Sequence, residues 1–147
     1  MHTPHDKERP WKMFSFIGRW PYKADLIKKQ WGDEFQFGIK HAAHYAWSSR
    51  DGIHWTPSEQ TPLIPFSDTQ ICPFWDAGSQ RYVAFLRFGP PNTRLISRTE
   101  SEDFLHWSPK ITVLRRTKMD TVQETQFYQM APLPYGNVYL GIVGAYH

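Results

Sequence analysis

One short pattern occurs twice in this chain, and the two copies are 52 residues apart. It places Ser, Asp, His, Trp and Pro at the same relative positions in both copies. The matched pairs are Ser49 and Ser101, Asp51 and Asp103, His54 and His106, Trp55 and Trp107, and Pro57 and Pro109. Self-similarity at a fixed period of about 20 to 50 residues indicates that one supersecondary unit is repeated along the chain. The pattern therefore restricts the chain to a repeat architecture.

The segments around the pattern are typical of strands. In residues 82–88 one set of alternating positions has Tyr82, Ala84 and Leu86, and the other has Val83 and Phe85. Both sets are apolar, as expected for a sheet that is packed between neighbouring sheets. Twelve Pro and nine Gly supply many short turns, and 16% of the residues are aromatic. These features predict an antiparallel all-β fold.

Four-stranded units that repeat at this spacing are typical of β-propeller blades. We expect a single partial β-propeller domain over residues 1–147, with about two to two and a half blades. Unit A covers about 5–66 and is interrupted by an insertion at 19–40. Unit B, about 67–118, is expected to be a complete four-stranded blade. Unit C, about 119–147, is incomplete and has two strands.

The repeated pattern is expected to form the turn into the outer strand of each blade. Asp51 and Asp103 would accept backbone N–H groups there, as Asx-turns do. Trp55 and Trp107 would fill the gap between adjacent blades, each mostly buried. On this interpretation the corner residues are structural and have no catalytic role.

Composition and charge exclude several classes of function. The net charge is +3, and the densest basic patch, Arg115, Arg116 and Lys118, is too short for nucleic-acid binding. The single Cys72 excludes an internal disulfide and is interpreted as a buried strand thiol. No apolar stretch approaches the ~20 residues of a membrane span. No signal peptide is recognised, so the localisation is unknown and cytoplasmic by default.

We expect neither a metal nor a cofactor. His41 and His44 have a spacing that would suit a metal site on a helix, but in a strand this spacing points the two side chains to opposite faces. No carboxylate or Cys lies at ligand spacing from them. Nucleotide-binding loops and the nucleophile elbow of hydrolases are also absent from the sequence.

At its corner motifs the chain resembles a known family. The segments "WKMF", "SSRDGIHW", "SDTQICPFWD", "RYVAFLR" and "SEDFLHW" are similar to the pattern of five-bladed β-propeller glycoside hydrolases. These are the family 32- and 43-like enzymes of the invertase, levansucrase and arabinanase superfamily. The resemblance extends from about residue 5 to 147. It implies a carbohydrate as the partner, bound in a funnel lined by the innermost strands.

The resemblance also implies a set of carboxylates, because glycoside hydrolysis needs one acid and one nucleophile or base. Asp68 matches the second-blade Asp, with a cap at the strand entry as its structural alternative. Glu124 is the candidate acid, with Asp120 as its competitor and a solvated loop residue as the alternative. The first-blade Asp would precede residue 1, since Asp6 aligns better with the turn residue Asp76. Hydrolysis is therefore expected only if the missing blades and that carboxylate are supplied.

Three further side chains are candidates for substrate binding. Arg87 lies in an inner-sheet strand, where it would reach the funnel or pair with a carboxylate such as Asp76. Trp20 and Trp31 belong to the insertion at 19–40, and would stack on sugar rings or cover the open unit.

A non-catalytic binding or self-assembling propeller module is the alternative function. The incomplete units A and C would leave unpaired strand edges and apolar faces, which a monomer does not readily expose. We therefore expect a homo-oligomer with head-to-tail contacts, in which three copies give about six blades. A two-fold dimer and an isolated fragment are the other possibilities.

Overall fold

The computed structural model describes residues 1–17, 43–57, 64–65, 70–88, 94–117 and 125–146. Every regular element within these residues is a β-strand, and none of them is a helix. Neighbouring strands pair antiparallel throughout. The predicted antiparallel all-β class is therefore confirmed.

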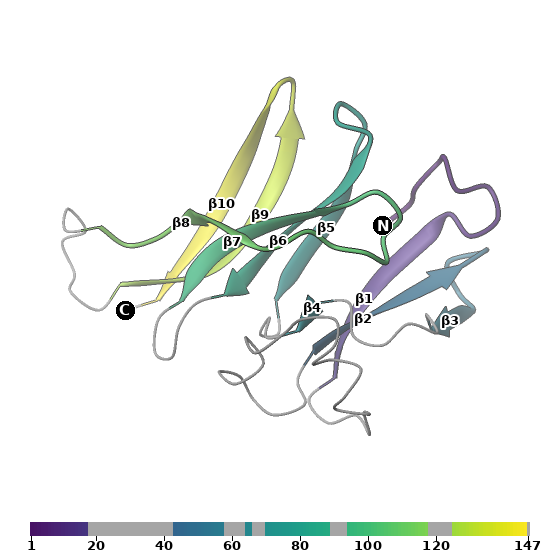
Figure 1. Cartoon of the computed structure of the whole chain (residues 1–147), viewed down its shortest axis with the longest axis horizontal. Coiled ribbons are helices and arrows are strands. Elements are labelled where there is room, and N and C mark those ends of the chain that lie inside the picture. The colour runs from purple at the N-terminus through teal and green to yellow at the C-terminus, as the bar shows by residue number, and fades with distance from the viewer. Residues whose placement is uncertain (18–42, 58–63, 66–69, 89–93, 118–124, 147) are drawn as a thin grey trace.

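The strands form three sheets (Figure 1). The first sheet has the order β1-β2-β3, with β4 also paired to β2, and consists of β1 (Trp11–Ile17), β2 (Ala43–Ser49), β3 (Trp55–Pro57) and β4 (Ile64–Pro65). The second sheet is a meander in chain order of β5 (Ile71–Asp76), β6 (Arg81–Phe88), β7 (Leu95–Ser101) and β8 (Ile111–Leu114). The third is a hairpin of β9 (Gln126–Tyr135) and β10 (Val138–Tyr146). The second sheet thus has the four antiparallel strands expected of a complete unit.

Both faces of the second sheet are buried, and the alternation along β6 explains why. One face presents Tyr82, Ala84 and Leu86 to a cluster that also contains Phe14 and Ala46 of the first sheet. The opposite face presents Val83, Phe85 and Ile96 to residues of the third sheet, Phe127, Met130 and Tyr139. The second sheet therefore lies between the other two, and the two-sided burial expected from its sequence is confirmed.

The first two sheets are built on the same register. Ser49 pairs with Trp11 of β1, and its counterpart Ser101 pairs with Tyr82 of β6. The strands β1 and β2 therefore correspond to β6 and β7. By the same register Phe14 of β1 corresponds to Phe85 of β6, because their partners are 52 residues apart.

The N-terminal residues lie beside β1 as β5 lies beside β6. The Met1 amine donates to the Lys12 carbonyl over 3.0 Å, and the Lys12 N–H donates back over 2.8 Å. In the turn that follows, the Asp6 carboxylate accepts the N–H groups of Glu8 and Arg9. This confirms Asp6 as a turn residue, and it shows that the N-terminal residues pair with the edge of β1.

The first corner is a compact network around Asp51. The Ser49 hydroxyl donates to Asp51 Oδ1 over 3.0 Å. The same oxygen accepts the N–H groups of Ile53 and His54, both over 2.8 Å, and Oδ2 lies 2.7 Å from His54 Nδ1. Asp51 thus holds the chain reversal between β2 and β3, as the sequence predicts.

The second corner repeats this network at Asp103. Ser101 donates to Asp103 Oδ1 over 3.0 Å, and the N–H groups of Leu105 and His106 reach the same oxygen over 2.8 and 2.7 Å. Oδ2 lies 2.6 Å from His106 Nδ1. The two corners are therefore structurally equivalent.

The two Trp residues occupy equivalent positions but differ in burial. Trp107 is 7% exposed, because Phe14 of the first sheet covers it with ring centroids 5.5 Å apart. Trp55 is less completely buried than Trp107, but most of its surface is still covered, so both side chains are mostly buried as expected. By register Trp55 lies on the face of the first sheet that points away from the second sheet. In the described residues no sheet packs against that face as the first sheet packs against Trp107.

The corners also differ at the position after the Asp. The first has Gly52 at φ +78°, and the second has Phe104 at φ +69°. This left-handed region suits glycine and costs any other residue roughly 1–2 kcal/mol. The Phe104 ring is buried between Phe14 and Tyr82. Burial of this ring offsets the backbone strain.

Candidate functional site

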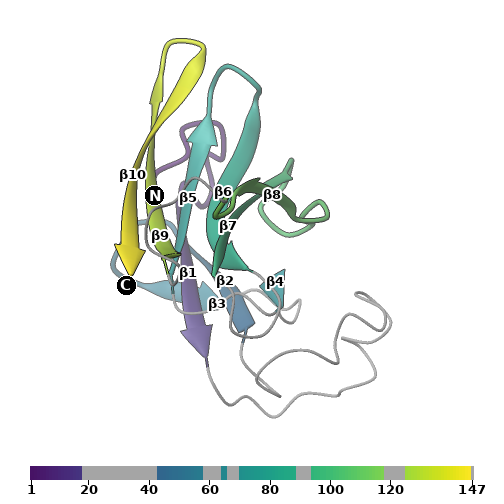
Figure 2. The ribbon, with the colours of Figure 1, turned by 90° about the vertical axis from the view of Figure 1, so that its left-hand side faces the viewer.

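At one end of the second and third sheets, strands β5 and β9 begin and strands β6 and β10 end. The first residue of β5, Ile71, pairs with Leu86 near the end of β6. The first residue of β9, Gln126, pairs with Tyr146 at the end of β10. In Figure 2 β5 and β9 run in the same direction, so that both begin at this end. Residues that immediately precede β5 and β9 in the sequence therefore enter the sheets there.

Two arginines and two tyrosines meet at this end, and we call them the arginine–tyrosine cluster: Arg87, Arg94, Tyr128 and Tyr146. The Arg87 guanidinium lies 4.2 Å from the centre of the Tyr128 ring. The Arg94 guanidinium lies 5.5 Å from the Tyr128 ring and 5.6 Å from the Tyr146 ring. All three distances are within the range of cation–π attraction. The cluster places two cations against two aromatic rings.

The cluster combines fixed cations with accessible rings. Arg87 is 5% exposed, and Arg94 donates a hydrogen bond to the Gln126 side chain. Tyr128 and Tyr146 are exposed to solvent. The guanidinium groups are thus held in place, while parts of both tyrosine rings remain available to a ligand.

The predicted pairing of Arg87 with Asp76 is wrong. Asp76 pairs in register with Arg81, six residues from Arg87 along β6, which corresponds to about 20 Å. The Asp76 carboxylate instead accepts the Tyr139 hydroxyl over 2.5 Å and the Ser79 hydroxyl over 2.7 Å. Arg87 therefore belongs to the opposite end of the strand, at the arginine–tyrosine cluster.

The other candidate site residues, Asp68, Asp120, Glu124, Trp20 and Trp31, lie outside the described residues. Their described neighbours are informative. Gln70 directly precedes β5, and Thr125 directly precedes β9. The structure therefore brings together, at the end that holds Arg87, the two strands that follow Asp68 and Glu124 in the sequence.

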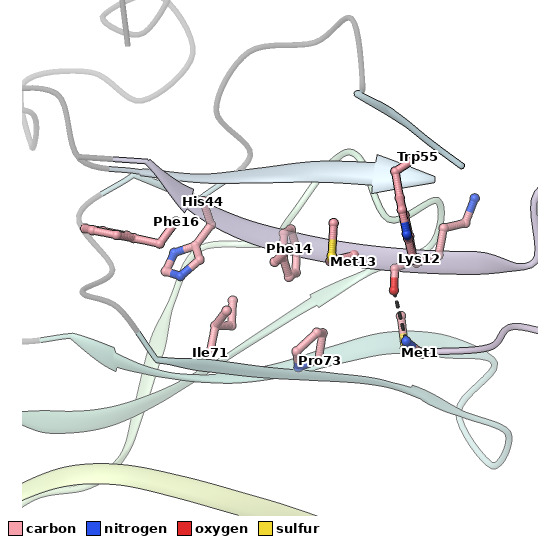
Figure 3. Close-up of a pocket in the computed structure, with 9 residues that line it drawn as sticks. All are labelled: Met1, Lys12, Met13, Phe14, Phe16, His44, Trp55, Ile71 and Pro73. Carbon is pink, nitrogen blue, oxygen red and sulfur yellow. Dashed lines mark hydrogen bonds between the residues drawn. The ribbon is translucent and has the colours of Figure 1, made fainter. Parts of the chain in front are cut away.

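A cavity of about 370 Å³ lies along β1 on the side of β5, and residues from both faces of the first sheet line it. Figure 3 shows Phe14 and His44 of the first sheet beside Ile71 and Pro73 of β5. The remaining lining residues are Met1, Lys12, Met13, Phe16 and Trp55. No carboxylate is among the described residues that line the cavity. The described part of its lining therefore supplies neither the acid nor the nucleophile that glycoside hydrolysis requires.

The carboxylates of the corners are held in their ionised form. Hydrogen bonds from the His54 side chain and from backbone N–H groups hold the pKa of Asp51 well below its ordinary value of 3.8. Burial raises the pKa of Asp103, but donors from His106 and the backbone outweigh it and lower that pKa to about 2. Neither group retains a proton near neutral pH, so neither is suited to act as a general acid.

Two other titratable side chains, Asp76 and Cys72, lie in environments that suit a structural role. The pKa of Asp76 is lowered by its hydrogen bonds from Tyr139 and Ser79. Burial raises the pKa of the Cys72 thiol, which disfavours the thiolate that nucleophilic catalysis needs. Cys72 lies in β5 and is half-buried. Its interpretation as a strand thiol agrees with this environment.

Arg94, Tyr128 and Tyr146 were not identified from the sequence. Tyr128 lies in "TQFYQ", whose similarity to "CPFWD" indicates a strand and gives no sign of a binding role. Arg94 and Tyr146 are far apart in the sequence, and no local pattern connects them. Only the packing of the third sheet against the second brings them together.

No family model matches the chain, and neither a curated protein nor a solved structure matches it. The resemblance to the glycoside hydrolases therefore depends on the motifs in the chain itself. The described residues contain no group of three or more His, Cys, Asp or Glu side chains arranged to hold a metal ion. Nor do they include a helix of the length and apolarity that crossing a membrane requires.

Proposed function

We propose that this chain is a carbohydrate-binding module of the glycoside hydrolase-like propeller type, and that an oligosaccharide binds at the arginine–tyrosine cluster. The observation that supports this proposal is the cluster itself. Its exposed rings Tyr128 and Tyr146 lie beside Arg87 and Arg94, at the end where β5 and β9 begin. In the family that the motifs resemble, the carboxylates that act on the sugar lie on the innermost strands, and Asp68 and Glu124 come shortly before β5 and β9 in the sequence.

The chemistry of the cluster suits a sugar. The apolar face of a pyranose or furanose ring packs against an aromatic ring, and Tyr128 and Tyr146 offer two such rings 6.2 Å apart. Guanidinium N–H groups donate to sugar hydroxyls, and buried Arg87 is already oriented by its contact with Tyr128. A few fixed polar groups beside apolar surface are typical of small-molecule sites.

Hydrolysis is a further step of the same proposal. It requires one carboxyl group as acid and a second as nucleophile or base. Glu124, or Asp120 in its place, is proposed as the acid. Asp68 matches the second-blade Asp, which in the resembled family stabilises the transition state or tunes a pKa, and the nucleophile or base would be the first-blade Asp. The described residues around the cluster supply the binding surface, and hydrolysis depends on a further carboxylate from a completed ring.

The proposal is tested by replacing one ring of the cluster and a matched ring elsewhere. Tyr128→Ala removes the cluster ring, and Tyr135→Ala removes an exposed ring at the other end of the same strand. Binding of arabino- and fructo-oligosaccharides is measured by isothermal titration calorimetry. We expect Tyr128→Ala to weaken binding about fivefold, in line with ~1 kcal/mol for an aromatic contact, and Tyr135→Ala to leave it unchanged. Equal effects of the two substitutions, or no binding by the unmodified chain, would refute the proposal.

A non-catalytic, self-assembling module is the second candidate function. It is favoured by a different observation, the apolar and exposed outer face of the third sheet.

A further inference from the structure

The face of the third sheet that points away from the second sheet is apolar and exposed. Its residues alternate with those that pack against the second sheet, and cross-strand pairs join Leu140 to Leu133 and Val138 to Tyr135. Leu140 is 51% exposed and Ile142 is 81% exposed. We call this set the third-sheet face: Leu133, Tyr135, Val138, Leu140 and Ile142. A contiguous apolar patch of this kind marks an interaction site.

The second sheet has an equivalent face, and there it is buried. Tyr82 in β6 and Tyr139 in β10 correspond, because each is near the start of its strand and points toward the preceding unit. The Tyr82 hydroxyl lies 3.1 Å from His5 Nε2 in the first turn, and the Tyr139 hydroxyl reaches Asp76 in the next turn. By this correspondence Ile142 lies at the position of Phe85, which is 4% exposed. The third sheet covers Phe85, and no sheet of the described residues covers Ile142.

The first sheet presents the complementary face. Trp11, Met13 and Trp55 share the side of the first sheet that points away from the second. Their counterparts in the second sheet are Tyr82, Ala84 and Trp107, all buried against the first sheet. We call Trp11, Met13 and Trp55 the first-sheet face. Figure 1 shows the first and third sheets at opposite ends of the molecule.

We propose that the third-sheet face of one copy of this chain binds the first-sheet face of a second copy. The chain already contains this type of contact twice, between the first and second sheets and between the second and third. The third-sheet face supplies one side of a further contact of this type, and the first-sheet face supplies the other side. A second copy is therefore the partner that matches both faces.

The internal contacts predict how the two copies meet. Phe14 of the first sheet covers Trp107 of the second, with ring centroids 5.5 Å apart. Ile142 occupies in the third sheet the position that Phe14 occupies in the first, since both correspond to Phe85 of β6. Trp55 occupies in the first sheet the position that Trp107 occupies in the second. Ile142 of one copy thus covers Trp55 of the next. Because each copy uses two different faces, the contact is head-to-tail and leaves one face of each kind at the ends of an open assembly.

The inference does not depend on sugar binding. The arginine–tyrosine cluster lies at one end of β9 and β10, and the third-sheet face lies on their outer side. Loss of carbohydrate binding in Tyr128→Ala would leave self-association unchanged. The two proposals therefore fail separately.

The test uses two variants that each disable one face. Ile142→Lys introduces a charge on the third-sheet face, and Met13→Lys introduces one on the first-sheet face. Ile111→Lys is the matched control, because Ile111 is an exposed isoleucine on β8 of the second sheet. Molecular mass is measured by sedimentation over the micromolar range, and circular dichroism shows that each variant is folded.

We expect the unmodified chain and Ile111→Lys to associate beyond the 17.4 kDa monomer. Ile142→Lys and Met13→Lys should each dissociate at least about tenfold more readily, because a charge in a desolvated apolar contact is costly. A mixture of these two variants should form a dimer, since each supplies the face that the other lacks. A monomeric unmodified chain would overturn the proposal. So would Ile142→Lys behaving like the control, or a mixture that remains monomeric while both variants are folded.

Discussion

The position of Phe104 allows a direct test of the balance between backbone strain and side-chain burial. Its φ of +69° is in the left-handed region, and its ring is 2% exposed. The ring contacts Phe14 at 4.7 Å and Tyr82 at 5.1 Å between centroids. Truncation to Ala should cost about 3–5 kcal/mol, because the contacts are lost while the strain remains. Truncation to Gly loses the same ring but relieves roughly 1–2 kcal/mol of strain.

The expected order of stability of the Gly and Ala variants is therefore the reverse of the usual one. Gly in place of Ala ordinarily lowers stability, but here Phe104→Gly should be about 1 kcal/mol more stable than Phe104→Ala. The free energy of unfolding is measured by urea denaturation followed by far-ultraviolet circular dichroism, with the slope compared between variants. The equivalent residue Gly52, at φ +78°, supports the expectation. A Phe104→Ala variant as stable as Phe104→Gly would show that the backbone strain argument is wrong.

Two further predictions concern the corners. Trp107→Ala should destabilise the fold by about 3–5 kcal/mol, and Trp55→Ala should destabilise it clearly less. Both losses are measured by urea denaturation at concentrations where the chain is monomeric. Equal losses would contradict the difference in burial. The lowered pKa values of Asp51 and Asp103 predict stability that is fully present above the unfolded value of 3.8 and is lost as the pH falls toward about 2. Thermal melting against pH should show a shallower acid limb in Asp103→Asn than in the unmodified chain, and an identical limb would refute the assignment.

Much of the fold follows from local sequence. The two faces of β6 were predicted because alternation along a strand is fixed by backbone geometry. The Asp51 and Asp103 turns were predicted because their hydrogen bonds join residues only two or three positions apart. Such features depend on neighbouring residues alone.

The errors concern features that depend on distant segments. The difference in burial between Trp55 and Trp107 was not predicted, because it depends on whether another sheet covers the residue and the identical corner motif carries no information about that. The partner of Arg87 depends on strand register and on where the third sheet packs. Sequence reasoning left Arg87 either reaching the funnel or pairing with a carboxylate such as Asp76; the fold excludes Asp76 and stacks Arg87 on Tyr128. The proposed carboxylates Asp68, Asp120 and Glu124 remain predictions, because they lie outside the described residues.

The contiguity of each sheet in the sequence has a consequence for folding. The first sheet uses strands between residues 11 and 65, the second between 71 and 114, and the third between 126 and 146. Among the described strands none of one sheet is inserted between strands of another, so each sheet can form before the next has been synthesised. The corner bonds close loops of only a few residues, and even ten-residue loops close in about 10–100 ns. Folding can thus advance along the chain from the N-terminus, and each finished sheet becomes the template on which the following one docks.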